Sequence, residues 1–454
     1  STDRPDELNT LGERNLDILN QVVFTSFSLI KGDTTFKPPD FELRVAPAFV
    51  FNHAEASEVS VLRVDPARGT DRDTAHLGFQ ELFIDLHLAN ISERYDFISS
   101  RIGIQRFQSD FRGFVFADEA PGARLFGNWD NNKWQYNLAW FDLLQKDTNT
   151  LLNTTFDRRY QNVYVANLYR QDTFALGHTL SASILHSSDN AGAHKAHFDD
   201  NGFLRRPASI GDERPKNLET TYFGLTGDGH FDRLNTTTAL YYVAGTESHN
   251  QISGVGTDVS AFMAALELSY DFDWLRFRTS AMWASGDDDP FDGDATGFDT
   301  IFDNPNFAGG DLSLWQRQGI PLIAGGEVFL TNRNSLVPNL RAGKEEGQAN
   351  FVNPGLRLFN LGLDIEVTPK LKVISNASFL QFDDVAVLRV LRQDGSFSRD
   401  IGFDLSSGLL YRPWLNNNVQ VRLGAATLLP GDGLKGLYGD ERLYQIFSNL
   451  ILEY

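Results

Sequence analysis

The chain ends in the stretch Leu443-Tyr-Gln-Ile-Phe-Ser-Asn-Leu-Ile-Leu-Glu-Tyr454. Successive side chains of an extended strand point to opposite faces. One face of this stretch would therefore carry Ile446, Ser448, Leu450, Leu452 and Tyr454. The other face would carry Gln445, Asn449 and Glu453, interrupted by the apolar residues Phe447 and Ile451. A strand that is mostly apolar on one side and closed by an aromatic ring is typical of a sheet between an apolar and a wet environment.

The same alternation recurs along most of the chain, in segments of roughly 9–13 residues. It is clearest in Phe41–Phe49, Gln80–Leu88 and Lys133–Trp140. Looser examples are Ser260–Tyr270, Trp274–Trp283, Phe359–Val367, Lys370–Phe379, Ile401–Tyr411 and Val419–Ala425. A period of two residues predicts half-buried strands rather than helices.

The connections between these segments are of two lengths. Short ones, such as Asp130–Asn132, Asp232–Arg233 and Thr368–Lys370, suit hairpin turns. Long ones, rich in Asp, Gly, Asn and Arg, cover residues 53–75, 108–121, 145–159, 188–219, 246–257, 286–355, 383–399 and 429–441. Short turns that alternate with long loops are typical of the two ends of an outer-membrane β-barrel.

The sequence therefore predicts an all-β fold, a transmembrane antiparallel up-and-down β-barrel that takes up residues 1–454 as one domain. About 17 strands can be identified, and because such barrels usually have an even number we expect about 18, with 16 as the alternative. The missing strand is expected before Val22, around Arg14–Leu19, so that residues 1–20 form either a first strand or a periplasmic arm. The longest loop, 286–355, would contain the apolar piece Ile320–Leu330 and is the candidate to fold inward and constrict the pore.

Composition argues against several other classes of protein. No run of apolar residues approaches the length of about 18 that a transmembrane helix needs. The chain has no cysteine, which excludes disulfides and thiol nucleophiles, and its net charge of −20 argues against nucleic acid as a partner. It contains no Gly-x-Ser-x-Gly elbow, phosphate-binding loop or His-Glu-x-x-His motif, so we expect no enzyme. It begins at Ser1 rather than Met, which suggests that a signal peptide has been removed.

One region carries a specific combination of motifs. Ser100-Arg-Ile-Gly-Ile-Gln-Arg-Phe-Gln108 is followed by Asp110 and then by Ala123-Arg-Leu-Phe-Gly-Asn-Trp129. This order resembles the alginate-exporter family of outer-membrane barrels, which has an Arg-x-Gly-x-Gln-Arg strand, a polar loop and a returning strand at this point. Further pieces similar to that family, in the same order, are Gln80–Leu86, His186–Asp189, Thr221–Gly224, Asp258–Phe262, Ala284–Asp287, Asp383–Asp384, Asp400–Asp404 and Pro430–Asp432.

The resemblance implies an 18-stranded outer-membrane channel that exports an acidic polysaccharide past lumen arginines. The matching positions here are Arg101, Arg106 and Arg124. Alternation places Gln105 on the same face as Arg101, whereas Arg106 has the opposite parity and would need a bulge, or a place beyond the lipid zone, to reach the lumen. A guanidinium stays charged and can bind a carboxylate through two hydrogen bonds, which suits the selection of an anionic solute.

The predicted lumen carries charges of both signs. Its expected acidic residues are Glu42, Glu81, Asp85 and Asp404, and its expected arginines, besides Arg101, are Arg44, Arg276, Arg278 and Arg422. This mixture departs from a purely basic lumen and leaves the identity of the solute open. The charged side chains could instead pair across neighbouring strands and simply fill a wet barrel.

The acidic stretch Gly286–Asp294 is a candidate calcium site. Asp287, Asp289, Asp292 and Asp294 offer oxygen ligands at close spacing, as Ca²⁺ requires, but the closing Glu of a twelve-residue calcium loop is absent. A solvated acidic surface is the alternative. We expect no other cofactor.

Aromatic residues near the predicted strand ends are candidates for girdles at the membrane interfaces, with sugar stacking as the alternative role. They are Trp129, Trp134, Trp140, Tyr270, Trp274, Trp283, Tyr411 and Trp414.

Together these features predict a passive channel in the bacterial outer membrane for a polar, anionic solute such as an acidic polysaccharide or oligosaccharide. The alternatives are a general small-solute porin, and a barrel that acts as a sheath or receptor for a partner protein. The expected partners are outer-membrane lipid with lipopolysaccharide, the solute, and either periplasmic export machinery or a protein in the lumen.

Overall fold

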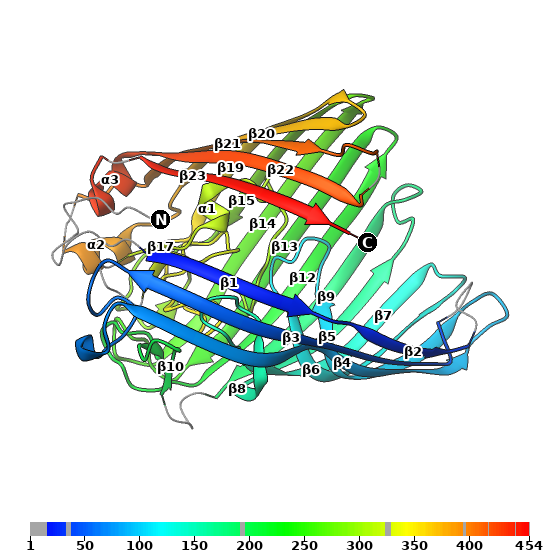
Figure 1. The fold of residues 1–454 in the computed structure, drawn as a ribbon, viewed down its shortest axis with the longest axis horizontal. Helices are drawn as coiled ribbons and strands as arrows, with labels where there is room; N and C mark the ends of the chain where they lie inside the picture. The colour runs from blue at the N-terminus through cyan, green and yellow to red at the C-terminus, as the bar shows by residue number, and fades with distance from the viewer. Residues whose placement is uncertain are drawn as a thin grey trace.

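A computed structural model describes residues 16–32, 38–190, 196–322, 328–393, 396–415, 417–440 and 442–453. Its main sheet has 19 strands, and consecutive long strands pair antiparallel in an up-and-down order (Figure 1). The long strands are β1 (Leu16–Phe24), β3 (Phe41–Ala56), β4 (Asp71–Asn90), β5 (Phe97–Gln108), β6 (Ala117–Trp129), β7 (Trp134–Lys146), β8 (Asn153–Arg170), β9 (Thr179–Asp189), β12 (Leu218–Phe231), β13 (Leu234–Glu247), β14 (Thr257–Phe272), β15 (Leu275–Ala284), β19 (Leu356–Thr368), β20 (Leu371–Gln381), β21 (Asp400–Tyr411), β22 (Val419–Pro430) and β23 (Leu443–Leu452). The prediction of an all-β, up-and-down sheet is confirmed.

Residue alternation sets which side chains face the interior. On β14, Ala261 and Met263 are almost completely buried, whereas their neighbours Phe262 and Leu266 are 48% and 42% exposed. A soluble sheet would hide its large apolar side chains and expose the small ones. Here the large ones are exposed, so the outer surface faces an apolar solvent.

The connections lie at two different ends of the sheet. Two-residue turns join β12 to β13, β14 to β15 and β19 to β20 at one end, which we call the short-turn end. Asp232 and Asp273 begin two of these turns with φ of 57° and 54°, a conformation that Asp tolerates better than most residues. The long connections, including 285–355, lie at the opposite, long-loop end (Figure 1).

The strand count is close to the predicted number of about 18. β1 and β2 (Phe27–Lys31) pair with successive parts of β3 as one bent strand, and β16 (Asp294–Ala295) is only two residues long, so 17 strands in the described chain run along the sheet. The described part of Arg14–Leu19 belongs to β1, so the prediction of a separate strand there is wrong; residues 1–15 and Tyr454 lie outside the described residues. Within the described ranges no pairing joins β1 to β23, and the two strands run in the same direction (Figure 1).

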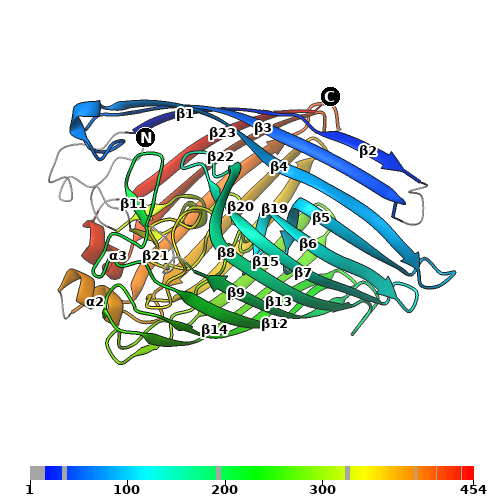
Figure 2. The same ribbon diagram turned by 90° about the horizontal axis from the view of Figure 1, so that it is seen from below.

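Three strands leave the wall at the long-loop end. β4 pairs with β5 only from Leu82 onwards, although β5 and β6 continue together to Gln108. The start of β8 takes the place of β5 beside β4, where the Asn153 side-chain amide donates to the backbone oxygen of Phe79 at 2.9 Å (Figure 2). A Cβ atom on Gly78 would lie 1.8 Å from the backbone oxygen of Asn153, so this close approach of β8 requires glycine. The ends of β5, β6 and β7 are thereby displaced into the lumen.

The long connection 285–355 fills much of the interior, and we call it the plug. Its short elements are β16, α1 (Leu314–Arg317), β17 (Ile320–Pro321) and β18 (Phe329–Thr331). The described ends of the apolar piece, Ile320–Leu322 and Val328–Leu330, are largely buried. Elsewhere the long-loop end carries η2 (Pro66–Arg68), β10 (His197–Phe198), β11 (Leu204–Arg206), α2 (Ala386–Arg392) and α3 (Asp432–Tyr438). Of the helices in the described ranges, none is long and apolar enough to cross a membrane.

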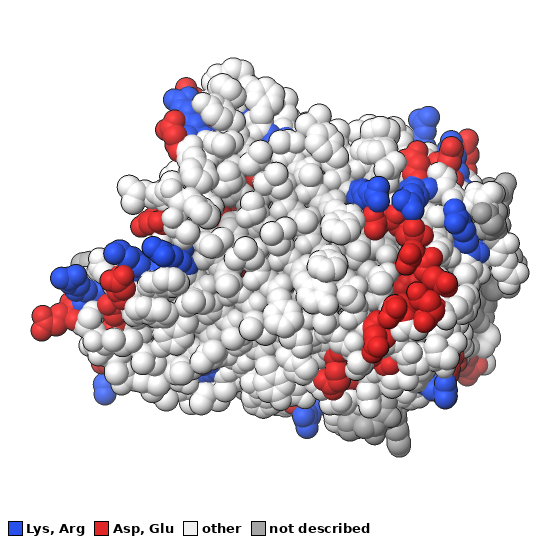
Figure 3. All heavy atoms as spheres, turned by 180° about the vertical axis from the view of Figure 1, so that it is seen from behind, with Lys and Arg blue, Asp and Glu red and all other residues white. Residues whose placement is uncertain are grey.

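The outer surface is divided into zones. Figure 3 shows, on the face it displays, a central zone without charged residues between charged zones at the two ends. Exposed apolar side chains on the outer faces of β12, β13, β14, β15 and β19 include Phe223, Leu225, Leu240, Phe262, Leu266, Phe277, Phe359 and Leu361. The predicted girdle residues Trp129, Trp140, Tyr270, Trp274, Trp283, Tyr411 and Trp414 are exposed. Trp134 is half-buried and stacks on Trp129 with ring centroids 5.6 Å apart.

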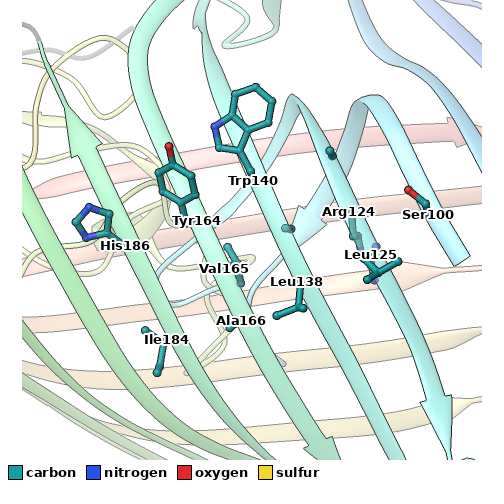
Figure 4. Close-up of a pocket in the computed structure, with 12 residues that line it drawn as sticks. Ser100, Arg124, Leu125, Leu138, Trp140, Tyr164, Val165, Ala166, Ile184 and His186 are labelled. Atoms are coloured by element: carbon teal, nitrogen blue, oxygen red, sulfur yellow. The ribbon is translucent and has the colours of Figure 1, made fainter. Parts of the chain in front are cut away.

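The outer face of β6 to β9 shows this zoning row by row. One cross-strand row is apolar and consists of Leu125, Leu138, Ala166 and Ile184 (Figure 4). The next row towards the long loops holds the rings of Trp140, Tyr164 and His186. The row beyond that is polar, with Asp142, Asn162, Ser188 and Glu219. A hollow of about 500 Å³ lies between the apolar and the aromatic rows.

Candidate functional site

A row of arginines lies on the lumen side of β3, β5 and β6. Arg44, Arg101 and Arg124 alternate with the rings of Phe83 and Phe126. The guanidinium of Arg101 lies 4.2 Å from the centre of the Phe83 ring, and that of Arg124 lies 4.5 Å from the centre of the Phe126 ring. Stacking on a ring holds a guanidinium in place without neutralising its charge, so its edge remains available to an anion.

The members of this row differ in their partners. The Nε and Nη2 atoms of Arg101 both donate to the Oδ2 atom of Asp85, at 2.9 and 2.6 Å, and Arg44 pairs with Glu42 at 2.6 Å and with Glu81 at 3.5 Å. Arg124 has no carboxylate partner among the described residues, and its Nε donates to the amide oxygen of Asn137 at 2.7 Å. Arg101 and Arg124 also stand directly opposite each other across β5 and β6. Like charges in that position repel each other, so Arg124 is the cation that an incoming anion would stabilise most.

Polar side chains surround Arg124 on the neighbouring inner wall. Asn137 and Asn167 face each other across β7 and β8, and the Asn167 amide donates to the Tyr169 hydroxyl and to the backbone oxygen of Ser109, both at 2.9 Å. The Oδ1 atom of Asn167 is buried without a hydrogen-bond partner. These groups can hydrogen-bond a solute that is held at Arg124.

Arg106 reaches the lumen despite its parity. It lies on the part of β5 that has left the wall, so both faces of the strand are inside the barrel. Its side chain is 75% exposed, and its Nε lies 3.7 Å from Glu119. Gln105, which was predicted to face the solute beside Arg101, is instead completely buried and bonds to the backbone oxygens of Arg101 and Gly103.

The other predicted lumen arginines lie elsewhere on the wall. Arg276 is paired with Asp271. Arg278 donates to Asn376 at 2.6 Å and lies 3.6 Å from Asp364. These partners belong to β14, β19 and β20, far along the sheet from the row on β3 to β6. Arg276 and Arg278 are thus compensated charges of the inner wall, separate from the arginine row.

The connection 109–116 forms a crossbeam through the lumen. Asp110 accepts hydrogen bonds from the backbone of Arg112, Gly113 and Phe114 and from the Tyr241 hydroxyl of β13. Arg112 then reaches Thr237, Asp228 and Glu267 on β12 to β14, at 3.4 and 3.6 Å from the two carboxylates. Its role was not predicted, because a loop arginine has no periodic pattern that would reveal its partners.

The plug is held together by a buried ion pair. Arg341 and Asp299 are both completely inaccessible and lie 2.6 Å apart. Asp299 also accepts hydrogen bonds from the backbone of Thr300 and Asn350. Burial would by itself lower the pKa of Arg341, but Asp299 more than offsets this and raises that pKa above its usual value. The guanidinium therefore stays charged inside the plug.

Arginines outside the plug hold it in place by donating hydrogen bonds to its backbone oxygens. Arg159 of β8 donates to the backbone oxygens of Glu345 and Gly347, and Arg206 donates to that of Glu346. Arg205 donates to the backbone oxygen of Ala342 at 2.8 Å. Burial raises the pKa of the Glu346 carboxyl to about 8, although Arg205 opposes this shift. On the far wall, Asp404 of β21 accepts from the Ser313 hydroxyl and from the backbone of Trp315 in α1.

The plug covers only part of the inner wall. Lumen-facing side chains beneath it are almost completely buried, among them Leu185, Val243, Ala261, Met263, Met282, Leu358 and Leu380. On β1 and β2, by contrast, the lumen-facing side chains of Ile18, Phe24 and Ile30 are 46%, 57% and 49% exposed. The open part of the lumen therefore runs along β1 and β2, whereas the inward residues Ala48, Val50 and Ala54 of β3 are completely buried.

The predicted calcium ligands do not come together. Asp289 and Asp292 accept hydrogen bonds from the backbone of Phe291 and Asp294 in local turns, and Asp294 lies in β16 beside β14. Asp287 accepts from the backbone of Thr296, and burial together with nearby carboxylates raises its pKa to about 7. In the part of the chain that is described, no three Asp, Glu or His side chains are placed to hold a metal ion.

Comparison with known proteins gives structural neighbours only. No protein-family model matches the sequence, and no curated protein matches it. Crystal structures with a similar fold include a BenF-like porin from Pseudomonas fluorescens Pf-5, at 9% identity, 96% and 98% coverage of this chain and of that chain, and a TM-score of 0.43. Pseudomonas aeruginosa OpdQ has 12% identity, 97% and 94% coverage and a TM-score of 0.47. Pseudomonas aeruginosa OccK2 (OpdF), solved in complex with glucuronate, has 10% identity, 96% and 98% coverage and a TM-score of 0.42. At this level of similarity the neighbours carry no argument for function.

Proposed function

We propose that the protein is a passive channel of the bacterial outer membrane for carboxylate-bearing solutes. The observation that carries this proposal is Arg124, a lumen-side cation beside Arg101 without a carboxylate partner in the described residues. A solute carboxylate supplies the missing charge and relieves the repulsion between the two arginines.

Membrane insertion is supported by the outer surface. The rows on β6 to β9 change from apolar to aromatic to polar within a few residues, as they would where lipid tails give way to head groups. The long loops then face the cell exterior and the short turns the periplasm, with lipid and lipopolysaccharide around the barrel.

The arginine row is suited to letting the solute pass through the channel rather than to retaining it. A single deep well would trap the solute, whereas several moderate sites let it move from one to the next. Arg44 and Arg101 already have carboxylate partners, so each attracts a solute carboxylate less strongly than Arg124 does. The arginine row therefore acts as a track with Arg124 as its strongest point.

The sequence also predicts a more specific solute, an acidic polysaccharide, and such a polymer would need a wider path through the barrel. A polymer would have to pass the plug and the crossbeam, so we propose monomeric or short carboxylates as the solutes that move through the plugged barrel. A sheath around a partner protein is less well supported, because the plug takes up the interior that a partner would occupy.

The test is ion selectivity in planar bilayers. Replacing Arg124 by alanine is expected to lower the Cl⁻ to K⁺ permeability ratio by about threefold to tenfold, because one uncompensated charge is lost from a partly desolvated site. Arg101→Ala is expected to have a smaller effect, because the buried Asp85 loses its partner and takes up a proton, so that the net charge of the lumen changes little. Arg158→Ala is the control, because this arginine is 56% exposed and paired with Asp142 away from the row. A selectivity that is identical in wild type and Arg124→Ala would contradict the proposal.

Membrane placement is tested separately. Leu361 lies near the middle of β19 and is 55% exposed, so Leu361→Arg is expected to destabilise the folded barrel in lipid vesicles by about 2–4 kcal/mol. Val64→Arg, at a loop residue that is 53% exposed, is expected to have no measurable effect. Urea unfolding of both variants in vesicles provides the comparison. Equal stability of Leu361→Arg and wild type would place this surface outside the bilayer.

A further inference from the structure

The open side of the lumen is lined by an apolar strip. The strip consists of Ile18, Val22, Phe24 and Ile30 on β1 and β2, and the polar residues Asn20 and Ser28 of the same face interrupt it. Ile18, Phe24 and Ile30 face inward because they pair with the inward residues Ala54, Ala48 and Glu42 of β3.

The strip lies beside the arginine row. Ser28 pairs with Arg44 and Ile30 with Glu42, so the apolar side chains of β1 and β2 adjoin the first charged residues of β3. Exposing apolar side chains to water is unfavourable, at about 25 cal/mol for each Å². A channel for purely polar solutes gains nothing from this strip, whereas a solute with an apolar part would cover it while passing.

A cavity joins the strip to a cation. Phe24 and Ala46 line a space of about 370 Å³ together with Gln80, Glu81, Arg106 and Glu119. Both carboxylates of the cavity lie near arginines, Glu119 at 3.7 Å from Arg106 and Glu81 at 3.5 Å from Arg44. The highly exposed Arg106 can therefore exchange Glu119 for a solute carboxylate while Phe24 covers the apolar part of the same molecule.

We propose that the channel prefers carboxylates that carry an apolar chain or ring over carboxylates that are polar throughout. This inference rests on the proposed function and narrows it to amphiphilic monocarboxylates. The charge is held by the arginines of β3, β5 and β6, and the apolar part slides along Ile18, Phe24 and Ile30.

The experiment compares two anions with six carbon atoms and one charge, hexanoate and gluconate. Reversal potentials of the full chain in planar bilayers at pH 8 give their permeability ratio. We expect the hexanoate-to-gluconate permeability ratio of the wild-type channel to exceed the ratio of the two mobilities in free solution by about fivefold. In the double variant Phe24→Ser and Ile30→Ser, the permeability ratio is expected to fall to about the mobility ratio, while the KCl conductance stays at its wild-type value.

Matched substitutions on the outer face of the same strands control for general damage. Val23 and Leu29 are 54% and 62% exposed and have the opposite parity, so Val23→Ser with Leu29→Ser is expected to keep the wild-type preference. A wild-type ratio equal to the mobility ratio would overturn the inference, as would an equal loss in the outer-face control. A wild-type channel that prefers K⁺ to Cl⁻ would instead overturn the proposed function, whatever the hexanoate ratio.

Discussion

Replacing Arg341 with alanine is expected to destabilise the seated plug by roughly 3–5 kcal/mol, because Asp299 is left as a buried charge without its partner. That corresponds to a shift of roughly a hundredfold or more in the equilibrium between the seated and the released plug. The backbone groups that Asp299 binds, those of Thr300 and Asn350, would lose their anchor at the same time. The expected result is rapid trypsin cleavage within the plug and frequent openings to a higher conductance.

An exposed arginine provides the control for this prediction. Arg357 pairs with Asp383 at 2.7 Å but is 52% exposed, so Arg357→Ala is expected to cost no more than about 1 kcal/mol and to leave the plug seated. Joint replacement of the buried pair, Arg341→Met with Asp299→Asn, is expected to recover part of the loss, because no unpaired charge remains. If Arg341→Ala resists trypsin as well as wild type does, the plug is not held by this ion pair.

Excising residues 299–350 and joining the ends with a short Gly-Ser linker is expected to raise single-channel conductance roughly threefold or more, since barrels of 16–18 strands without an internal plug leave a wide aqueous channel. The same change exposes side chains that the plug now buries, such as Met263 and Leu358. Each large apolar side chain returned to water costs about 1.5–3 kcal/mol, so the variant is also expected to unfold at lower urea concentration. Both effects follow from one cause, the removal of the inner packing layer.

Excision of exposed loop residues 64–68 is the comparison for this second variant. These residues contact little of the barrel, so conductance and urea stability are expected to stay at wild-type values. A plug-free variant with unchanged conductance would show that the solute path never passes the space that residues 299–350 occupy.

Much of the sheet could be predicted from the sequence, because each strand carries its own alternation. The inner and outer faces of β14, for example, follow directly from the small and large residues between Thr257 and Phe272. The position of the first strand is predicted wrongly because β1 mixes apolar and polar residues on both faces, with Ile18 and Asn20 on one and Leu19 and Gln21 on the other, and so has no clear parity. The stretch that seemed to hold two strands is one bent strand, β1 and β2.

The site was predicted in part, for a physical reason. Arg101, Arg124 and Asp85 lie on regular strand positions, where parity determines the face. Arg159 and Arg206 bind backbone oxygens of the plug. Because every residue has a backbone oxygen, the side-chain pattern of the sequence cannot reveal such an acceptor. Residues far apart in the chain, such as Arg112 and Glu267, become neighbours only through the crossbeam, which periodicity cannot reveal.

The point at which β5 leaves the wall also determines which mutations the protein can accept during evolution. Gly103 marks the point of departure, with φ of 126° and a Cβ position that would lie 2.0 Å from the backbone oxygen of Leu82. Beyond it, residues 105–108 no longer separate lipid from water, so a new charge at the exposed positions Arg106 and Gln108 carries no cost in membrane insertion, whereas Gln105 and Phe107 are buried. Mutations in this short stretch can therefore change solute preference while assembly is preserved, provided that the glycine before it is retained.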